Sequence, residues 1–388
     1  MKKRVAIVSA ARTPFTRAHK GELRDTRPDT LAAWVIEAVV SRVPGLDPKE
    51  IDDVIIGCAM PEAEQGFNVA RIASLLAGLP YEVPAITINR FCSSGVQSIA
   101  HAAQAIMLGE IDVAIAGGTE SMSMVPLGGN KFSVNPELME RYPEAYTMMG
   151  ATAEIVAERF GVSREDQDRF AYESQRRCAE AQAAGRLDAE VIEVKPHFID
   201  DEEIRSLSVS RDTINRPETT LEGLAKLKPA FRPRGSVTPG NASPLTDGAA
   251  AVLLMSEEKA AALGLKPLGY FHSLQVAGVP PEIMGTGPVP AVRKLLAKNG
   301  LRIEDIDVVE LNEAFAAQAL YCIRELGLDP ERVNPNGGAI AVGHPLGVSG
   351  TRMAMTLLHE LNRRGGRWGI VTMCVGGGMG AAALFEAA

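Results

Sequence analysis

Among the residues of this sequence, Cys92 has the sequence context that most favours a catalytic role. It lies in NRFCSSG, residues 89–95, between a short apolar run and the helical pattern GVQSIAHAAQAIMLG. A thiol at a helix start meets unpaired backbone N–H groups and the positive end of the helix dipole, which favour a thiolate near neutral pH. Most cysteines are buried small hydrophobes, but these polar, tightly turning flanks favour a reactive thiol. The sequence therefore predicts a nucleophile at Cys92.

A nucleophilic thiol needs a base and an oxyanion-stabilising group, and two further residues are candidates. His344 lies in NGGAIAVGHPLGVSG, residues 336–350, a Gly- and Pro-rich run typical of a loop. The alternative is a histidine that only stabilises the loop. The glycines let other backbone segments come close to His344 on both sides, and this favours a functional histidine. Cys374 follows the strand pattern WGIVTM, and the glycines after it expose N–H groups at a strand end, where open α/β sheets bind ligands. These groups predict proton transfer rather than a metal site, because a fourth ligand is missing.

Asn312 completes the candidate set. It lies in ELNEAFAAQ, residues 310–318, where a strand pattern gives way to a helical one. Its amide is placed either to orient a water or to cap the helix N-terminus, and the two roles can coexist.

The composition indicates a globular protein with more than one packed unit. A chain of 388 residues exceeds the size at which one hydrophobic core usually keeps growing. No apolar run approaches the roughly 20 residues that span a bilayer, so we expect a soluble protein without a membrane span. The net charge of -8 argues against nucleic-acid binding. Five cysteines without close pairs favour a reducing compartment, the cytoplasm, over a disulfide framework.

Hydrophobic patterning predicts an α/β protein with an internal duplication. Short β-rich runs at 4–9, 54–57, 85–89 and 112–117 alternate with helical patterns. EIDDVIIGCA at 50–59 matches DIDVVELNEA at 305–314 with an offset of 255 residues, and the Ser-Gly pairs at 94–95 and 349–350 share that offset. Between the halves, residues 120–248 differ in composition and include a helix predicted from Ser163 to Gly185. We interpret this segment as an insertion.

The motifs, in their order along the chain, resemble those of the thiolase family. NRFCSSG, GGTESMS, GNASPLTDGAA, NEAFA, GGAIAVGHPLGVSG and CVGGGMG carry the resemblance, which extends from residue 4 to the C-terminus and is greatest to the bacterial degradative 3-ketoacyl-CoA thiolases. It implies the thiolase fold, an α/β architecture with two duplicated halves in a layered α-β-α-β-α arrangement. The expected parts are 1–119 with 249–270 as the N-terminal half, 120–248 as an inserted loop domain that binds CoA, and 271–388 as the C-terminal half.

The resemblance also implies a role for each catalytic candidate. Cys92 would be the acylated nucleophile, and His344 would activate it. His344 and a water held by Asn312 would form one oxyanion hole, and the N–H groups of Cys92 and Gly376 a second. Cys374 would be the acid and base. The reaction would be cleavage of 3-ketoacyl-CoA by CoA in fatty-acid β-oxidation, without a cofactor, since CoA is a substrate.

The CoA contacts are likewise implied by the resemblance. Arg216, in NRPETTLEGLAKLKPAF, would meet the nucleotide end of CoA, and Ser243 would contact its pantetheine. Met149, Met284 and Phe315 would line the tunnel, although plain core packing is the alternative for these three.

The sequence leaves several alternatives open. The nearest alternative is a biosynthetic acetoacetyl-CoA thiolase, also called an acetyl-CoA acetyltransferase. Met148 disfavours this alternative, because those enzymes tend to have histidine at the matching position. A non-catalytic CoA- or acyl-binding protein on the same scaffold is disfavoured by the three reactive groups. The resemblance implies a homodimer or homotetramer, with residues 85–130 as an interface, and leaves open a partner subunit in a β-oxidation complex. Acyl-chain length and reaction direction are not determined by the sequence.

Overall fold

The computed structural model describes residues 3–200 and 203–388. Its main sheet consists of β10 (Val308–Leu311), β11 (Trp368–Val375), β12 (Met379–Ala387), β9 (Gly269–Gly278), β1 (Val5–Arg12), β8 (Thr246–Ser256), β5 (Val113–Ser121), β3 (Asp53–Gly57) and β4 (Ala85–Ile88), in that spatial order, with β2 (Thr16–Arg17) beside β8. A separate hairpin is formed by β6 (His197–Asp200) and β7 (Glu203–Ser206).

The α-helices divide between the two halves and the segment that connects them. They are α1 (Pro28–Ser41), α2 (Val69–Leu76), α3 (Ser94–Leu108), α4 (Pro136–Arg141), α5 (Met149–Arg159), α6 (Arg164–Ala183), α7 (Leu221–Ala225), α8 (Glu257–Ala262), α9 (Pro288–Asn299), α10 (Ala316–Leu326), α11 (Ala339–Val342) and α12 (Ser349–Arg364). No helix of the described residues is long and apolar enough to cross a membrane.

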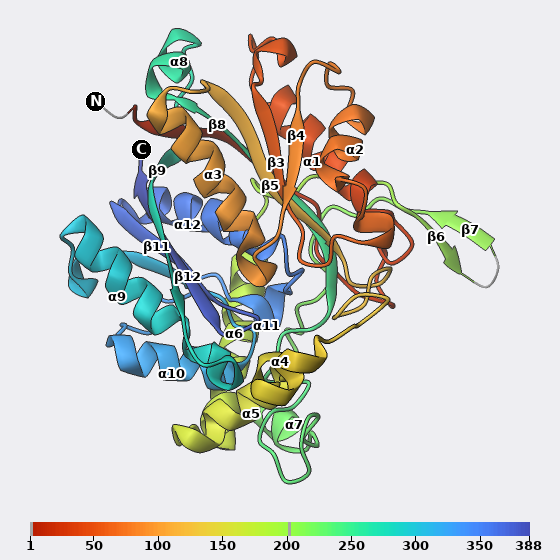
Figure 1. Ribbon diagram of the computed structural model, residues 1–388, viewed down its shortest axis with the longest axis vertical. Helices are drawn as coiled ribbons and strands as arrows, with labels where there is room; N and C mark the ends of the chain where they lie inside the picture. Colours follow the sequence, from red (N-terminus) through yellow and green to blue (C-terminus); the bar gives the residue numbers. More distant parts are fainter. Residues whose placement is uncertain (1–2, 201–202) are drawn as a thin grey trace.

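The predicted five-layer arrangement is confirmed (Figure 1). The helices α3 and α12 form the middle layer, and their apolar side chains share one core with the strands on both sides. A second core lies between α1 and the strands of the first half, and a third lies between α9, α10 and the strands of the second half. The strands of the two halves are nevertheless one continuous sheet, because β1 pairs antiparallel with β9.

The internal duplication is visible in the starts of matching elements. β3 and β10 begin at Asp53 and Val308, and β5 and β11 begin at Val113 and Trp368. The helices α3 and α12 begin at Ser94 and Ser349. Each pair is 255 residues apart, which is the offset expected from the sequence. The two candidate cysteines therefore belong to different halves, with Cys92 just before α3 and Cys374 near the end of β11.

Glycines let the first turns of α3 and α12 touch. A Cβ atom on Gly95 would lie 2.8 Å from the Gly347 carbonyl oxygen, and one on Gly350 would lie 2.4 Å from the Val96 backbone nitrogen. Real Cβ atoms do not approach other atoms this closely. The Ser-Gly pair at each helix start therefore brings the Cys92 turn and the His344 loop together.

The variant Gly350→Ala should destabilise the protein, because its new methyl group would clash with the backbone of Val96, which cannot rotate away as a side chain can. Overpacking of this kind costs about 1–3 kcal/mol, and the expected result is a lower midpoint of thermal unfolding. Gly278→Ala is the matched control, since its nearest atom lies 3.9 Å away. Equal midpoints for the two variants would contradict the close contact.

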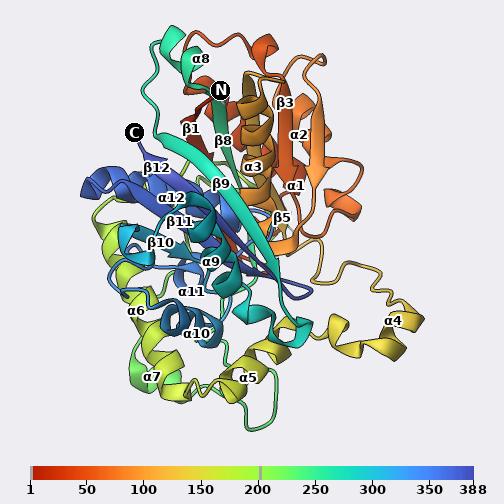
Figure 2. The same cartoon turned by 60° about the vertical axis from the view of Figure 1, so that its left-hand side comes forward.

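The segment between the halves is attached to the body by a buried ion pair. Arg12, in β1, forms two hydrogen bonds with the Asp212 carboxylate, of 2.6 and 2.8 Å, and a third with Glu190 at 3.0 Å. The predicted helix of this segment is α6, and the Ser163 hydroxyl accepts a hydrogen bond from the Asp166 N–H as its N-cap. Farther out, α4 projects away from the body (Figure 2).

Candidate active site

Cys92 lies in a strained turn between β4 and α3. The turn is a short 3-10 segment, Phe91–Ser93, and Phe91 adopts a left-handed φ of 42°. The Asn89 side chain accepts a hydrogen bond from the Phe91 N–H, and the Ser94 hydroxyl donates to the Phe91 carbonyl. A bulky residue in this conformation persists only where its surroundings hold it. The strain at Phe91 therefore fixes the direction in which the next residue, Cys92, presents its thiol.

Two backbone N–H groups, that of Cys92 itself and that of Gly376, favour the charged form of the Cys92 thiol. Burial raises the pKa of Cys92 to about 11, although both N–H groups oppose the shift. The Cys92 N–H, just before α3, favours the thiolate as the sequence suggested, but burial outweighs it. In the free protein Cys92 is thus a neutral thiol at pH 7, contrary to the predicted thiolate, and a base must remove its proton.

The rate of Cys92 alkylation by iodoacetamide should therefore keep rising at pH values at which an ordinary thiol is already ionised. Because only the thiolate reacts and its pKa is raised, we expect about a tenfold rise per pH unit from 7 to 9.5, without a plateau. The rate is followed by mass spectrometry of the Cys92 peptide, with Cys92→Ser as the control for labelling at other sites. A plateau below pH 8 would contradict the raised pKa.

His344 is held at both ring nitrogens. Its Nδ1 lies 2.5 Å from the Ser349 hydroxyl, which itself donates a hydrogen bond to the Pro345 carbonyl at 3.1 Å. The hydroxyl therefore accepts from Nδ1–H, which assigns the hydrogen to Nδ1 and leaves Nε2 as the acceptor. Burial, aided by the charge of Arg352, lowers the pKa of His344 to about 3. The imidazole is consequently neutral at pH 7, with Nε2 unprotonated, and it is a weaker base than an ordinary histidine.

Asn312 contacts the other side of the imidazole. Its Nδ2 lies 3.2 Å from His344 Nε2, and its backbone N–H donates to the Thr372 carbonyl in β11. Its buried Oδ1 has no hydrogen-bond partner among the described residues, so this oxygen can accept from a water or a substrate. The interpretation of Asn312 as a helix cap is wrong, because α10 begins at Ala316, after Phe315.

Cys374 lies near the end of β11, fully buried. Burial raises the pKa of its thiol well above the ordinary value, and the nearby Cys92 and Cys322 add to the shift. The Cys322 thiol itself donates to the Gly285 carbonyl at 3.3 Å. Cys374 is therefore a protonated thiol at pH 7, and it interacts electrostatically with Cys92.

The predicted tunnel residues surround Cys374. Met149, Met284 and Phe315 share one apolar cluster with this cysteine. Ser243 is adjacent, since its backbone N–H and its hydroxyl both donate to the Ala314 carbonyl. Arg216 is different: it is exposed, and its backbone N–H donates to the Gln175 side chain on α6.

Two residues of this region were missed by the sequence analysis. Phe231 is 48% exposed and packs edge-to-face on Phe315, with ring centres 5.9 Å apart. Its position in the segment expected to bind CoA was the available signal. Glu120 is buried and accepts hydrogen bonds from the backbone of Ala59 and Gly347, so it joins the His344 loop to the end of β3. Its motif was recognised, but no pattern predicted those partners.

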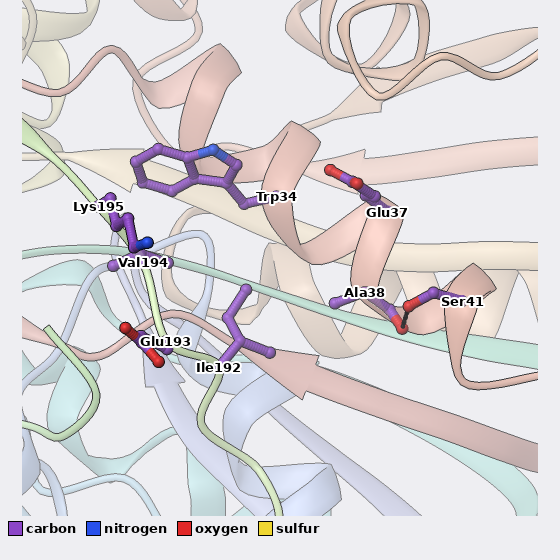
Figure 3. Close-up of a pocket in the computed structure, with 8 residues that line it drawn as sticks. All are labelled: Trp34, Glu37, Ala38, Ser41, Ile192, Glu193, Val194 and Lys195. Atoms are coloured by element: carbon purple, nitrogen blue, oxygen red, sulfur yellow. Dashed lines mark hydrogen bonds between the residues drawn. The ribbon is translucent and has the colours of Figure 1, made fainter. Parts of the chain in front are cut away.

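A surface cavity of about 320 Å³ lies elsewhere, between α1 and residues 192–195 (Figure 3). Residues of α1, among them Trp34 and Glu37, line it together with Glu193 and its neighbours. The catalytic candidates do not line it. Among the described residues, no cluster of His, Cys, Asp and Glu side chains is arranged to hold a metal ion, and the five cysteines are buried and free of disulfides.

Comparison with known proteins gives consistent matches over the whole chain. The family description "Thiolase, N-terminal domain" matches residues 5–258, and "Thiolase, C-terminal domain" matches residues 265–387. The chain is 54% identical over 389 residues to 3-ketoacyl-CoA thiolase of Bacillus subtilis, covering 99% of each protein. It is 48% identical over 386 residues to the human peroxisomal 3-ketoacyl-CoA thiolase, covering 98% of this chain and 90% of the relative.

Solved structures show the same similarity in three dimensions. Human mitochondrial 3-ketoacyl-CoA thiolase superposes with a TM-score of 0.90 at 39% identity, and the acetyl-CoA acetyltransferase of Bacillus anthracis with a TM-score of 0.89 at 42% identity. Each comparison covers 100% of this chain and 99% of the other.

Proposed function

The chain belongs to the thiolase family, and on that premise we propose that it cleaves 3-ketoacyl-CoA with CoA to acetyl-CoA and an acyl-CoA shortened by two carbons. The enzyme is an acyltransferase, and it has the thiolase fold. The observation that carries the proposal is that two buried thiols from different halves interact electrostatically: Cys92 raises the pKa of Cys374, and the Gly376 N–H, two residues after Cys374, acts on Cys92. A single covalent nucleophile needs a separate proton donor, and this arrangement supplies both.

In the first half-reaction, the Cys92 sulfur attacks the 3-keto carbon while its proton passes to His344. The bond between carbons 2 and 3 then breaks, and its electron pair forms the enolate of acetyl-CoA. Cys374 gives its proton to carbon 2, and acetyl-CoA leaves. The acyl group remains on Cys92 as a thioester. The N–H groups of Cys92 and Gly376 would stabilise the charge that develops on the attacked carbonyl oxygen, and the support is that both groups act on the Cys92 thiol.

In the second half-reaction, the Cys374 thiolate takes the proton of free CoA. The CoA sulfur attacks the thioester, the bond to Cys92 breaks, and His344 returns its proton to the departing sulfur. All groups are thereby restored. His344 and a water on Asn312 would stabilise the enolate oxygen, for which the unpartnered Oδ1 of Asn312 is the supporting observation. We propose no cofactor, since CoA is a substrate and each step uses only these side chains.

For CoA, we propose that the pantetheine follows Ser243 and the apolar cluster of Met149, Met284 and Phe315 toward the thiols. The support is the burial of the cluster around Cys374 and the half-exposed ring of Phe231 packed on Phe315. Arg216, which is exposed, would meet a phosphate of the nucleotide end.

The deciding experiment is a steady-state assay of CoA-dependent cleavage of 3-ketoacyl-CoAs of four to sixteen carbons by the purified chain. Cleavage of long chains by this chain alone would support the degradative function and exclude an obligatory partner subunit. Activity confined to acetoacetyl-CoA would instead indicate the biosynthetic type. Absence of turnover at every length would favour a binding protein.

The acetyl-CoA acetyltransferase alternative has one supporting observation, the fold match to the Bacillus anthracis enzyme at 42% identity. The 54% identity to the Bacillus subtilis 3-ketoacyl-CoA thiolase is higher. In this chain Met148 is 65% exposed immediately before α5, beside Met149, so an apolar side chain stands at the entrance of the proposed tunnel. That environment suits an acyl chain and so favours the degradative function.

We further propose a homodimer or homotetramer, built through the free edge of β4. This strand lies at one end of the sheet, and Ile86 within it is 47% exposed. Phe67 is 92% exposed, and its neighbour Asn68 hydrogen-bonds the Ala85 carbonyl of β4. Unpaired edges with exposed apolar side chains favour strand pairing between copies. Sedimentation of Ile86→Lys against the wild type tests this interface, with a monomer expected.

The remaining proposals concern organisation and location. We propose the three-part division at 119, 248 and 270; its support is that β8, which follows the inserted segment in the chain, pairs with β1 and β5, which precede it. A cytoplasmic location is supported by the five free cysteines, which suit a reducing compartment.

A further inference from the structure

A buried ion pair joins the two elements on either side of His344. Arg352 lies on α12 and Glu310 on β10, and Arg352 Nη1 donates to Glu310 Oε2 at 2.9 Å. Both side chains are almost completely shielded from solvent, with exposed fractions of 2% and 0%. The two residues are 42 positions apart, so the contact depends on the assembled fold.

Each of these elements also carries one hydrogen-bond partner of the imidazole. The first residue of α12 is Ser349, whose hydroxyl binds His344 Nδ1 at 2.5 Å. Directly after β10 comes Asn312, whose Nδ2 lies 3.2 Å from Nε2. A shift of α12 relative to β10 would therefore move the two partners of the imidazole apart.

Packing alone does not require charged residues at these positions. Val308 and Glu310 are two residues apart on β10 and so face the same layer, where Val308 packs in one core with Leu357 and Leu361 of α12. A buried ion pair is often no more stabilising than apolar side chains of the same volume. Among the described residues, Glu310 Oε1 and Arg352 Nε have no hydrogen-bond partner. These two unpaired atoms add to the free-energy cost of burying the ion pair.

We propose that the Arg352–Glu310 pair is a positioning device for the catalytic histidine, fixing α12 against β10 so that Ser349 and Asn312 hold the two nitrogens of His344. The inference rests on the proposed function of His344 as the base of a thiolase. Neither Arg352 nor Glu310 touches the reacting atoms, so both act through the histidine.

The charges around the pair support this role. Burial and, after it, the charge of Arg352 lower the pKa of His344. Burial raises the pKa of Glu310, and the adjacent Arg352 guanidinium opposes that rise by favouring the carboxylate. Three further carboxyl groups add to the rise at Glu310: Glu190, Glu313 and Glu360. Without Arg352, His344 would lose a neighbouring cation, and the pKa of its imidazole would rise.

The test is the double variant Glu310→Leu/Arg352→Met, which replaces both charges by apolar side chains of similar size. Such a replacement usually preserves folding, whereas removing one partner alone leaves an unpaired buried charge. We expect unchanged thermal stability, an unchanged KM for CoA and a 10- to 100-fold loss of kcat, because small misplacements of catalytic groups cost about that much. The acid limb of the kcat/KM profile should move to higher pH.

Arg363→Met is the matched control. Arg363 lies on the same helix, but its partner Glu360 also lies on α12, so this pair joins no second element. We expect wild-type kcat and an unchanged pH profile. Arg352→Lys should recover part of the kcat lost in Arg352→Met, since it restores the charge without the planar guanidinium.

A second readout does not depend on turnover. Nitrogen-15 histidine spectra, assigned with His344→Gln, should show a single Nδ1–H tautomer for His344 in the wild type and a mixture of tautomers in the double variant. Wild-type kcat together with an unchanged tautomer in a folded double variant would overturn the inference. Should the wild type cleave no 3-ketoacyl-CoA, the proposed function fails, and the tautomer still decides whether the pair positions His344.

Discussion

Cys92→Ala is expected to reduce kcat for 3-ketoacyl-CoA cleavage by roughly 10⁴-fold or more, because it removes the sulfur atom that carries the acyl group in the proposed mechanism. The turn that presents this residue depends on Asn89 and Ser94, and neither of their hydrogen bonds to Phe91 involves the thiol. The variant should therefore keep the fold and bind CoA normally.

Mass spectrometry of the protein mixed with 3-ketoacyl-CoA measures the same prediction directly. The wild type should gain the mass of one acyl group on the Cys92 peptide, and Cys92→Ala should gain none. Cys178→Ala is the control, since Cys178 is a buried thiol in the core shared by the two halves. Its variant should still be acylated at Cys92. Residual turnover of more than one part in a hundred in Cys92→Ala would contradict covalent catalysis by this residue.

Cys374→Ala is expected to lower kcat by about 10²- to 10⁴-fold, the usual contribution of a general acid or base. Both half-reactions should slow, because in the proposed mechanism Cys374 protonates the enolate in the first and deprotonates CoA in the second. The variant retains Cys92, so it should accumulate acyl-enzyme when CoA is limiting, whereas Cys92→Ala cannot.

The pH dependence separates Cys374 from a residue that only packs. Free thiols ionise with a pKa near 8.5, so raising the pH from 7 to 9 supplies CoA thiolate without a protein base. Thiolysis of preformed acyl-enzyme by Cys374→Ala should therefore approach the wild-type rate as the pH rises. Cys322→Ala is the control, because Cys322 is equally buried but donates its proton to the Gly285 carbonyl. A deficit of Cys374→Ala that stays constant with pH would exclude its role as the base for CoA.

Local patterns in the sequence were sufficient to predict the architecture. Apolar alternation and helical spacing depend on near neighbours in the chain, so β1, β3, β4 and β5 were found from the sequence, as was the Ser163 cap of α6. The offset of 255 residues predicted the duplicated halves, because each half repeats the same local order of elements. The motifs were specific enough to identify Cys92, His344 and Cys374 as candidates.

Only the tertiary structure decided how these groups behave. The pKa of Cys92 depends on burial by residues far away in the chain, and no local pattern showed that burial would outweigh the helix start. The joining of both halves into one sheet depends on the pairing of β1 with β9, more than 250 residues apart. The edge-to-face packing of Phe231 on Phe315 and the link between Arg352 and Glu310 also join distant positions. The sequence alone thus determined which groups are present and on which elements they lie, whereas their distances, protonation and mutual orientation required the folded chain, because long-range packing sets all three.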